Sequence, residues 1–458
     1  MKSLNSPWLI GLMVVCLVAV AGCAHEPLAP DTTMEDLTPG AWKEKIEEVT
    51  VSSLNWSDFD DQLLAGLIDR ALQNNPDITT STAALELAMI GLDESQANRR
   101  PDYGVDARIG GVETRNLGFV DSYGATARAS YEIDLWGIQK GNVRIAELDI
   151  ISAQTGLLTT RISLAAEVTK AYYNLRVLDQ RLRLQQETLG YMLRQRSFIK
   201  ARHKAGLISG IDVNNQEVEV QRLYARIEDL KADRSLAEQG LAILVGEPPQ
   251  RFDLISSLDV NMPRFLLEPD TPAEVLRVRP DIMASEARLE SSYIRFEQAR
   301  KAFYPTVSLS ASTGYASGSL SDLIRDASFG WTIGADIIAT LLDNGGRERN
   351  VERARINAKS SMASYRKTIL AALQDVERAL TVQETTQRQL EIQKLALAAQ
   401  ERLTRETEAK YLQGSISGFD LVRQQRSLVA QRENHLTTQL QGLQATVALL
   451  RALGVAPE

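Results

Sequence analysis

The sequence has few of the residues that build disulfide bonds, metal sites or catalytic sites. Its 458 residues include two cysteines and three histidines. Cys16 lies in an N-terminal apolar stretch that resembles an export signal, so the mature chain keeps one cysteine and cannot form an internal disulfide. The histidines are far apart in the sequence and lack the spacing of metal ligands, and nucleotide and metalloprotease motifs are absent. We therefore expect neither an enzyme nor a metal or other bound cofactor.

Long apolar runs are also missing beyond the N-terminus. Residues 1–22 combine Lys2 with an apolar run of 12 residues, which is shorter than the ~20 residues that a membrane-spanning helix needs. We interpret this segment as a signal peptide. No apolar run of 18 or more residues follows it, so any crossing of a membrane has to be made by strands.

The residues Val20-Ala21-Gly22-Cys23 resemble a bacterial lipobox, in which cleavage precedes the cysteine and an N-acyl diacylglycerol is attached to it. An ordinary signal peptide cut near Ala21 is the alternative. Ala24 after the cysteine favours the outer membrane over the inner membrane. We therefore expect Cys23 to be lipidated and residues 23–58 to form a lipid-anchored N-terminal segment.

A block of Lys and Arg is absent too. The formal net charge is −8, and it falls to −9 when Lys2 leaves with the signal. This acidic balance argues against nucleic acid as a partner.

The chain does contain a duplication. Pro76-Asp77-Ile78 returns 204 positions later, and Gly206-x-x-Ser209-Gly210-x-Asp212 returns 208 positions later as Gly414-x-x-Ser417-Gly418-x-Asp420. We interpret residues 59–246 and 271–458 as two structural repeats and residues 247–270 as the linker between them.

Each repeat is predicted to hold one β-hairpin, at residues 103–135 and 306–341, where apolar and polar residues alternate. The segments are about ten residues long, which suits strands that cross a bilayer at a tilt. The Gly-, Asp- and Ser-rich residues 113–122 and 316–328 are expected to be loops. If the polar face lines a wet lumen, it carries the charged residues Asp106, Arg108, Arg128, Glu132, Asp134 and Asp336. The alternative is a half-buried sheet on a soluble core.

Four strands are too few to close a membrane barrel, and an open edge in lipid would leave backbone groups unsatisfied. A dimer would supply eight strands and a trimer twelve, and the pattern does not choose between them.

Helical periodicity over residues 143–203 and 351–412 predicts two helices of ~60 residues, each about 90 Å long. The shorter helices at 77–99 and 211–245 together match the length of one long helix. Two short helices stacked end to end could therefore pair with a long one in coiled-coil packing.

In these features the chain resembles the TolC-type outer membrane efflux proteins, and most closely their lipid-anchored branch serving resistance-nodulation-division pumps. The motifs that carry the resemblance are the lipobox, Trp56-Ser57-x-Phe59-x-Asp61, Asn75-Pro76-Asp77-Ile78, Leu135-Trp136-Gly137, Leu342-Asp343-x-Gly345-Gly346-Arg347 and the paired Gly-x-x-Ser-Gly-x-Asp turns.

The resemblance implies an α+β membrane protein that forms a homotrimer. Its twelve-stranded β-barrel would lie in the outer membrane and continue into the periplasm as an α-helical barrel. A periplasmic membrane-fusion adaptor and an inner-membrane pump would be its partners, and it would be a passive exit duct for drugs or other toxic solutes. The alternatives are a non-spanning periplasmic coiled-coil lipoprotein that acts as a scaffold, and an outer membrane channel for type I protein secretion.

The resemblance also implies that the two repeated turns form the periplasmic tip and gate of the duct. Arg423 and Ile416 differ from residues that some relatives use for closed-state ion pairing. A ring of Asp420 carboxylates would favour cations, whereas the alternative role of Asp212 and Asp420 is to cap helices. The expected tip residues are Gly206, Ser209, Gly210, Asp212, Tyr411, Gly414, Ser417, Gly418, Asp420 and Arg423.

Overall fold

The computed structural model describes residues 38–43, 56–114, 118–254 and 271–457. The predicted signal peptide, the lipidation site Cys23, most of the predicted anchor segment 23–58 and most of the linker 247–270 lie outside these residues. The chain divides into two compact units. Unit 1 includes residues 83–154 and 283–367, and unit 2 includes residues 34–82, 155–282 and 368–458. Each unit therefore draws on both halves of the sequence.

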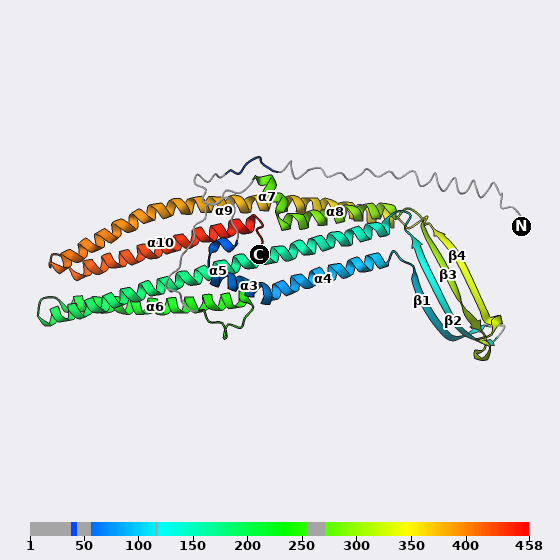
Figure 1. Ribbon diagram of the computed structural model, residues 1–458, viewed down its shortest axis with the longest axis horizontal. Coiled ribbons are helices and arrows are strands. Elements are labelled where there is room, and N and C mark those ends of the chain that lie inside the picture. The colour runs from blue at the N-terminus through cyan, green and yellow to red at the C-terminus, as the bar shows by residue number, and fades with distance from the viewer. Residues whose placement is uncertain (1–37, 44–55, 115–117, 255–270, 458) are drawn as a thin grey trace. The chain divides into compact units, whose positions relative to one another are not determined.

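Unit 1 contains a four-stranded antiparallel sheet with strands in sequence order (Figure 1). Its strands are β1 (Asp102–Thr114), β2 (Gly118–Ile133), β3 (Thr306–Ser317) and β4 (Phe329–Ile338). The two predicted hairpins are confirmed, and β2 pairs with β3, so the strands of the two repeats form one continuous sheet.

The first predicted loop, 113–122, is wrong for most of its length because β1 and β2 continue into it. Gly111 pairs with Asp121 and Glu113 with Phe119. A Cβ on Gly111 would lie 2.2 Å from the Phe119 ring, so this glycine makes room for an aromatic neighbour within the hairpin. The second loop holds two short 3-10 helices, η2 (Leu320–Asp322) and η3 (Asp326–Ser328).

The helices of unit 1 are the larger parts of α4 (Pro76–Ala97) and α8 (Pro280–Lys301) and the first parts of α5 (Ile138–Lys204) and α9 (Gly346–Leu412). Trp136, from one of the motifs that carry the resemblance, stacks on Tyr304 and donates a hydrogen bond of 2.7 Å to the carbonyl oxygen of Pro305. This contact ties the end of β2 to the start of β3.

Both long helices begin five residues earlier than predicted. The reason is an aspartate before each of them. The carboxylate of Asp134 accepts the amide of Lys140 at 2.8 Å, and that of Asp343 accepts the amide of Arg347 at 2.8 Å. These carboxylates satisfy amides of the first helical turn that would otherwise have no partner.

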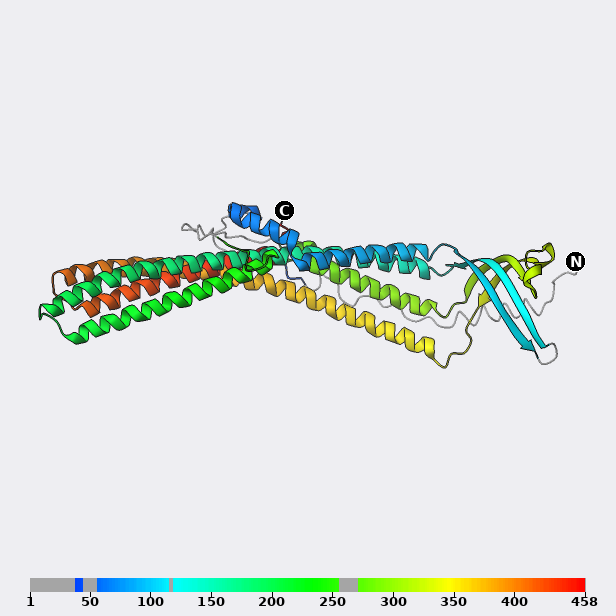
Figure 2. The ribbon, with the colours of Figure 1, turned by 90° about the horizontal axis from the view of Figure 1, so that it is seen from below.

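Unit 2 contains η1 (Trp56–Phe59), α3 (Gln62–Asn74), α6 (Gly210–Val245), α7 (Pro272–Val278), α10 (Gly418–Ala452) and the remaining parts of α4, α5, α8 and α9. Its main hydrophobic core joins η1 and α3 to α5, α6, α9 and α10, with Leu67, Tyr173, Leu241 and Val447 nearly inaccessible to solvent. Figures 1 and 2 both show the α5–α6 turn and the α9–α10 turn at the same end of this unit.

No helix among the described residues is both long enough and apolar enough to cross a membrane.

Candidate functional site

The sheet separates polar from apolar side chains across all four strands. Paired residues point to the same side of a sheet, and the register aligns Gly104 with Arg128, Ser312 and Thr332. One residue away, Tyr103 aligns with Ala129, Ala311 and Ile333. The predicted alternation is therefore in phase from β1 to β4, which gives the sheet one polar and one apolar face.

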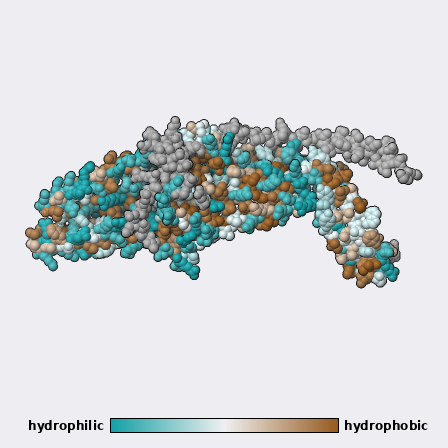
Figure 3. Space-filling view, viewed as in Figure 1, coloured by the Kyte–Doolittle hydropathy of each residue, from teal (hydrophilic) through white to brown (hydrophobic). Residues whose placement is uncertain are grey.

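The apolar face is open to solvent in the single chain. Tyr103 is 76% exposed, Val105 84% and Ile333 75%. Figure 3 shows apolar residues, in brown, on the part of the sheet that faces the viewer. An apolar surface of this extent is typical of an interface with protein or lipid.

The polar face places five of the six predicted lumen residues on one side, since Asp106, Arg108, Arg128, Glu132 and Asp336 share the same phase. The Arg128 Nε lies 3.7 Å from the Asp106 Oδ2, an exposed ion pair that contributes about 0–1 kcal/mol. Glu132 and Asp336 flank Ser308 in register, so two carboxylates lie two strands apart.

Asp134 does not lie in the strand, contrary to the prediction that places it on the polar face. It follows the last residue of β2, and its carboxylate accepts the Lys140 amide at the start of α5. The alternating pattern continues through Asp134 in the sequence, but the strand has ended there, so this side chain caps a helix.

The two predicted tip turns have the same backbone geometry. Gly206 and Gly414 have φ values of 73° and 75°, in the left-handed region that favours glycine. In the first turn, the amides of Gly206 and Leu207 donate to the carbonyls of His203 and Arg202, and the second turn repeats both bonds. This pattern is a Schellman cap, and it explains why these glycines recur.

Ser209 and Ser417 begin the helices that follow. The Ser209 Oγ accepts the Ile211 amide at 3.1 Å and the Asp212 carboxylate accepts the Ser209 amide at 3.2 Å, which forms a capping box. The Ser417 Oγ accepts the Asp420 amide at 3.2 Å and donates to the Asp420 Oδ2 at 2.7 Å. Both aspartates thus take part in helix caps, and the ring of Asp420 carboxylates stays a prediction.

Asp420 also has a charged partner within the chain. The Arg423 Nη2 lies 3.1 Å from the Asp420 Oδ1. Arg423 therefore lies beside the Asp420 carboxylate and offsets its charge.

Tyr411 is an expected tip residue, but its aromatic contact at the second turn could not be predicted from the sequence. Tyr411 is 9% exposed and makes an edge contact with Phe198, with ring centroids 6.0 Å apart. Its ring also lies against Gly418. Burial raises the pKa of Tyr411 above its usual value. Phe198 belongs to α5, so this aromatic contact joins the two helical hairpins, and no local motif marks Phe198 as a partner of Tyr411.

Polar contacts reinforce this junction between the α5–α6 and α9–α10 hairpins. The Arg426 Nη1 lies 2.9 Å from the Glu219 Oε2, and the Tyr191 hydroxyl donates to the Glu408 Oε1 at 2.9 Å. Met192 and Val422 belong to a small apolar core nearby. The turns are therefore held by contacts between residues that lie far apart in the sequence.

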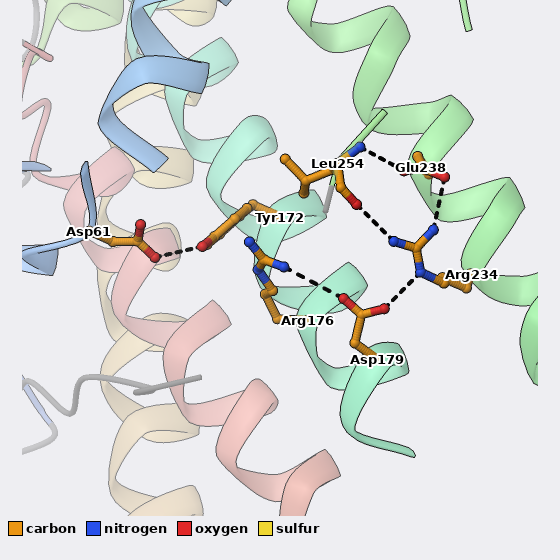
Figure 4. A network of polar contacts seen from close by, with 7 residues as sticks. All are labelled: Asp61, Tyr172, Arg176, Asp179, Arg234, Glu238 and Leu254. Carbon is orange, nitrogen blue, oxygen red and sulfur yellow. Dashed lines mark hydrogen bonds and ion pairs between the residues drawn. The ribbon is translucent and has the colours of Figure 1, made fainter. Parts of the chain in front are cut away.

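A buried polar network on α5 ties the N-terminal end of α3, at Asp61, to the long helices (Figure 4). The Tyr172 hydroxyl donates to the Asp61 Oδ2 at 2.6 Å, and burial, with the hydrogen bond to Asp61, raises the pKa of Tyr172 to about 12. Arg176 lies with its guanidinium 4.9 Å from the centre of the Tyr172 ring and 3.6 Å from the Asp179 carboxylate.

The same network continues onto α6. The Arg234 Nε donates to the Asp179 Oδ1 at 2.7 Å, and the Arg234 Nη2 donates to the carbonyl of Leu254 at 2.9 Å. Glu238 accepts the Leu254 amide at 2.9 Å and pairs with Arg234. These bonds hold residues 252–254 against the helix pair.

No group of three or more His, Cys, Asp or Glu residues in the described parts of the chain is arranged to hold a metal ion.

The chain matches the family model for outer membrane efflux proteins over residues 67–247 and 271–455. It is 26% identical to the pyoverdine export outer membrane protein OpmQ of Pseudomonas aeruginosa, over 97% of this chain and 96% of that protein. It is 28% identical to the outer membrane protein OprJ of the same species, over 95% of this chain and 94% of OprJ. The solved open state of the Neisseria gonorrhoeae MtrE outer membrane channel has the same fold, with a TM-score of 0.82, 23% identity, and coverage of 94% of this chain and 97% of MtrE.

Proposed function

Because the chain belongs to the outer membrane efflux protein family, we propose that it is the outer membrane exit duct of a tripartite efflux pump. It carries small molecules through the outer membrane and acts on them by no chemistry of its own. The similarity to OpmQ and OprJ along nearly the whole chain supports this assignment.

The observation that carries the proposal is the two-faced sheet. An apolar face suits contact with lipid acyl chains, and a polar face with charged residues suits a water-filled passage. The sheet ends in β1 and β4, whose outer edges have no strand partner within the described chain. In a membrane these edges have to pair with other copies. Three chains give twelve strands, which matches the homotrimer that the family resemblance implies.

The charged residues of the polar face then line the lumen of the barrel. Glu132 and Asp336 from each chain contribute carboxylates at one level, and Arg128 and Asp106 form a pair nearby. The passage is polar along its wall and is acidic at the level of Ser308.

The two turns form the periplasmic tip, where the duct meets its partners. Leu207, Ile211, Leu412 and Phe419 are exposed apolar side chains at or beside these turns. They offer a docking surface for a periplasmic membrane-fusion adaptor, through which an inner-membrane pump of the resistance-nodulation-division class delivers cargo. Tyr411, Asp420 and Arg423 belong to the gate. Acylation of Cys23 anchors the N-terminus of each chain to the outer membrane.

Substituted cysteines on β3 test the duct directly. Ser310 lies on the polar face and its neighbour Ala311 on the apolar face, so they are a matched pair. In planar bilayers, a charged water-soluble thiol reagent should change the conductance of a Ser310→Cys channel and leave that of an Ala311→Cys channel unaltered. A protein that gives no conductance, even with an opened tip, would support the scaffold alternative.

A further inference from the structure

Unit 2 contains a pocket of about 440 Å³ that the proposed duct does not use. It lies among α5, α9, α10 and the junction between α7 and α8. Its wall combines four cationic side chains with two carboxylates: Lys170, Arg279, Arg378, Arg451, Asp281 and Asp375.

One of the four cations is compensated. Arg279 is 6% exposed. Its guanidinium makes a two-pronged contact with Asp281, at 3.0 and 2.7 Å, and donates to the carbonyl of Ala452 at 2.6 Å. Asp375 lies 3.5 Å from the same guanidinium. Both carboxylates of the pocket are therefore directed to Arg279.

The other three cations lack such partners. The side chains of Lys170, Arg378 and Arg451 make no hydrogen bond or ion pair with any residue of the described chain. Burial lowers the pKa of Lys170, and the charge of Arg451 lowers it further, while Glu167 on the same helix opposes both effects. With four cations and two carboxylates, the wall carries a formal charge of +2.

Two of the four cations, Arg279 and Arg451, have no charged counterpart in the first repeat, whereas Lys170 itself belongs to the first repeat and Arg378 lies 208 positions after it. Residues 208 positions earlier in the first repeat are Asp233 for Gln441, Leu236 for Gln444 and Ile243 for Arg451, and Asn75 stands 204 positions before Arg279. Arg279 donates to the carbonyl of Ala452, and Asn75 makes the equivalent bond, because its side-chain amide donates to the carbonyl of Leu244, the counterpart of Ala452. Arg279 and Arg451 therefore add positive charge that the fold does not require at these positions.

We propose that the pocket binds one small oxyanion per chain, carrying two or more negative charges, of the phosphate or polycarboxylate kind. Lys170, Arg378 and Arg451 would contact its oxygens, and Gln441 and Gln444, which also line the pocket, can donate further hydrogen bonds. Charge-assisted hydrogen bonds of this type are stronger than neutral ones and suit arginine in particular. The proposal is independent of conduction through the barrel.

Calorimetric titration of the full-length protein in detergent tests the proposal, with inorganic phosphate and citrate as separate probes in low-salt buffer. We expect one site per chain and an affinity that weakens as salt rises. Arg451→Gln should weaken binding by about tenfold or more, as expected for the loss of roughly one charge-assisted hydrogen bond. Arg402→Gln, an exposed position on α9 outside the pocket, is the matched control and should bind like the wild type.

Asp375→Asn tests the sign of the effect without weakening the site. Removing this carboxylate should tighten binding of either probe, a gain that a merely misfolded variant would not produce. Competition by a soluble short-chain phosphatidic acid would identify a lipid headgroup as the source of the anion, and lack of competition would identify a free anion. Both results support the proposed chemistry.

Two results would overturn the proposal. One is binding that persists in the double variant Arg378→Gln/Arg451→Gln. The other is the absence of binding of both probes to the wild type. If Arg451→Gln then also dissociates the oligomer, these cations pair instead with carboxylates of a neighbouring copy.

Discussion

Asp179 holds two arginines in the interior of unit 2, and its removal should destabilise the protein strongly. The side chains of Asp179 and Arg176 are 3% and 4% exposed, and that of Arg234 is 19% exposed. In Asp179→Ala both guanidinium groups lose their shared carboxylate. Breaking a buried pair by removing one partner costs about 3–5 kcal/mol.

The contacts that survive place the expected cost near the lower end of that range. Arg234 keeps Glu238 and the carbonyl of Leu254, and Arg176 keeps its position over the Tyr172 ring. We therefore expect a loss of about 3 kcal/mol in the free energy of unfolding. The smaller change Asp179→Asn keeps the shape and one acceptor and should cost less.

Denaturant unfolding followed by far-ultraviolet circular dichroism measures this difference. Asp229→Ala removes an exposed carboxylate on α6 and is the control. Hydrogen exchange at Leu254 supplies a local readout, because the network holds that segment. If Asp179→Ala lies within ~1 kcal/mol of the control, the size expected of an exposed ion pair, the buried network does not stabilise the fold as argued.

Three further predictions address the sheet, the gate and the buried tyrosine. A Cβ on Gly314 would lie 2.1 Å from the backbone oxygen of Ala125, whereas a Cβ on its cross-strand partner Gly330 would meet nothing within 4 Å. Gly314→Ala should therefore abolish assembly of the channel, measured on native gels, and Gly330→Ala should not. Asp420→Ala should weaken the block of the conductance by polyvalent cations and raise antibiotic leakage. Arg423→Ala should strengthen the block, because it frees the Asp420 carboxylate from its ion pair. Equal block in both variants would contradict a role of Asp420 and Arg423 in the gate. The pKa of Tyr172 in the folded state is raised to about 12 from 10.0, so its contribution to stability is complete below pH 10 and is lost as the pH rises toward 12. Tyr172→Phe should therefore flatten the fall of the unfolding free energy between about pH 10 and pH 12. An unchanged slope would show that Tyr172 does not titrate as inferred.

The parts of the fold that follow from local periodicity could be predicted. A period of two sets the face on which each side chain lies, so the phase of Arg128 and Ser312 is correct although they belong to different repeats. The resemblance to outer membrane efflux proteins is confirmed by the match to the family model.

Where the prediction failed, a local pattern competed with a capping or packing contact. Asp134 continues the polar phase of β2, but its hydrogen bond to the amide of Lys140 belongs to the next helix. Residues 113–122 have the composition of a loop, yet cross-strand pairing extends β1 to Thr114 and begins β2 at Gly118. Such contacts are specified by three-dimensional neighbours that composition does not reveal.

The contacts at the tip and in the buried network could not be predicted because they join residues that are distant in the sequence. Arg426 and Glu219 come from opposite repeats, as do Phe198 and Tyr411. Each is an ordinary surface or core residue within its own helix, and no spacing rule connects it with its partner.

The ladder between β2 and β3 also sets an order of folding. It pairs residues from Tyr123 with Ser317 to Ile133 with Val307, so the sheet cannot be completed until the second repeat has been synthesised. The helical hairpins depend on nearer contacts and can form sooner, since local contacts fold faster than distant ones. During that interval β1 and β2 expose both an apolar face and an open edge, which are hazards for aggregation. The first hairpin therefore keeps this apolar face and open edge exposed until the second hairpin pairs with it.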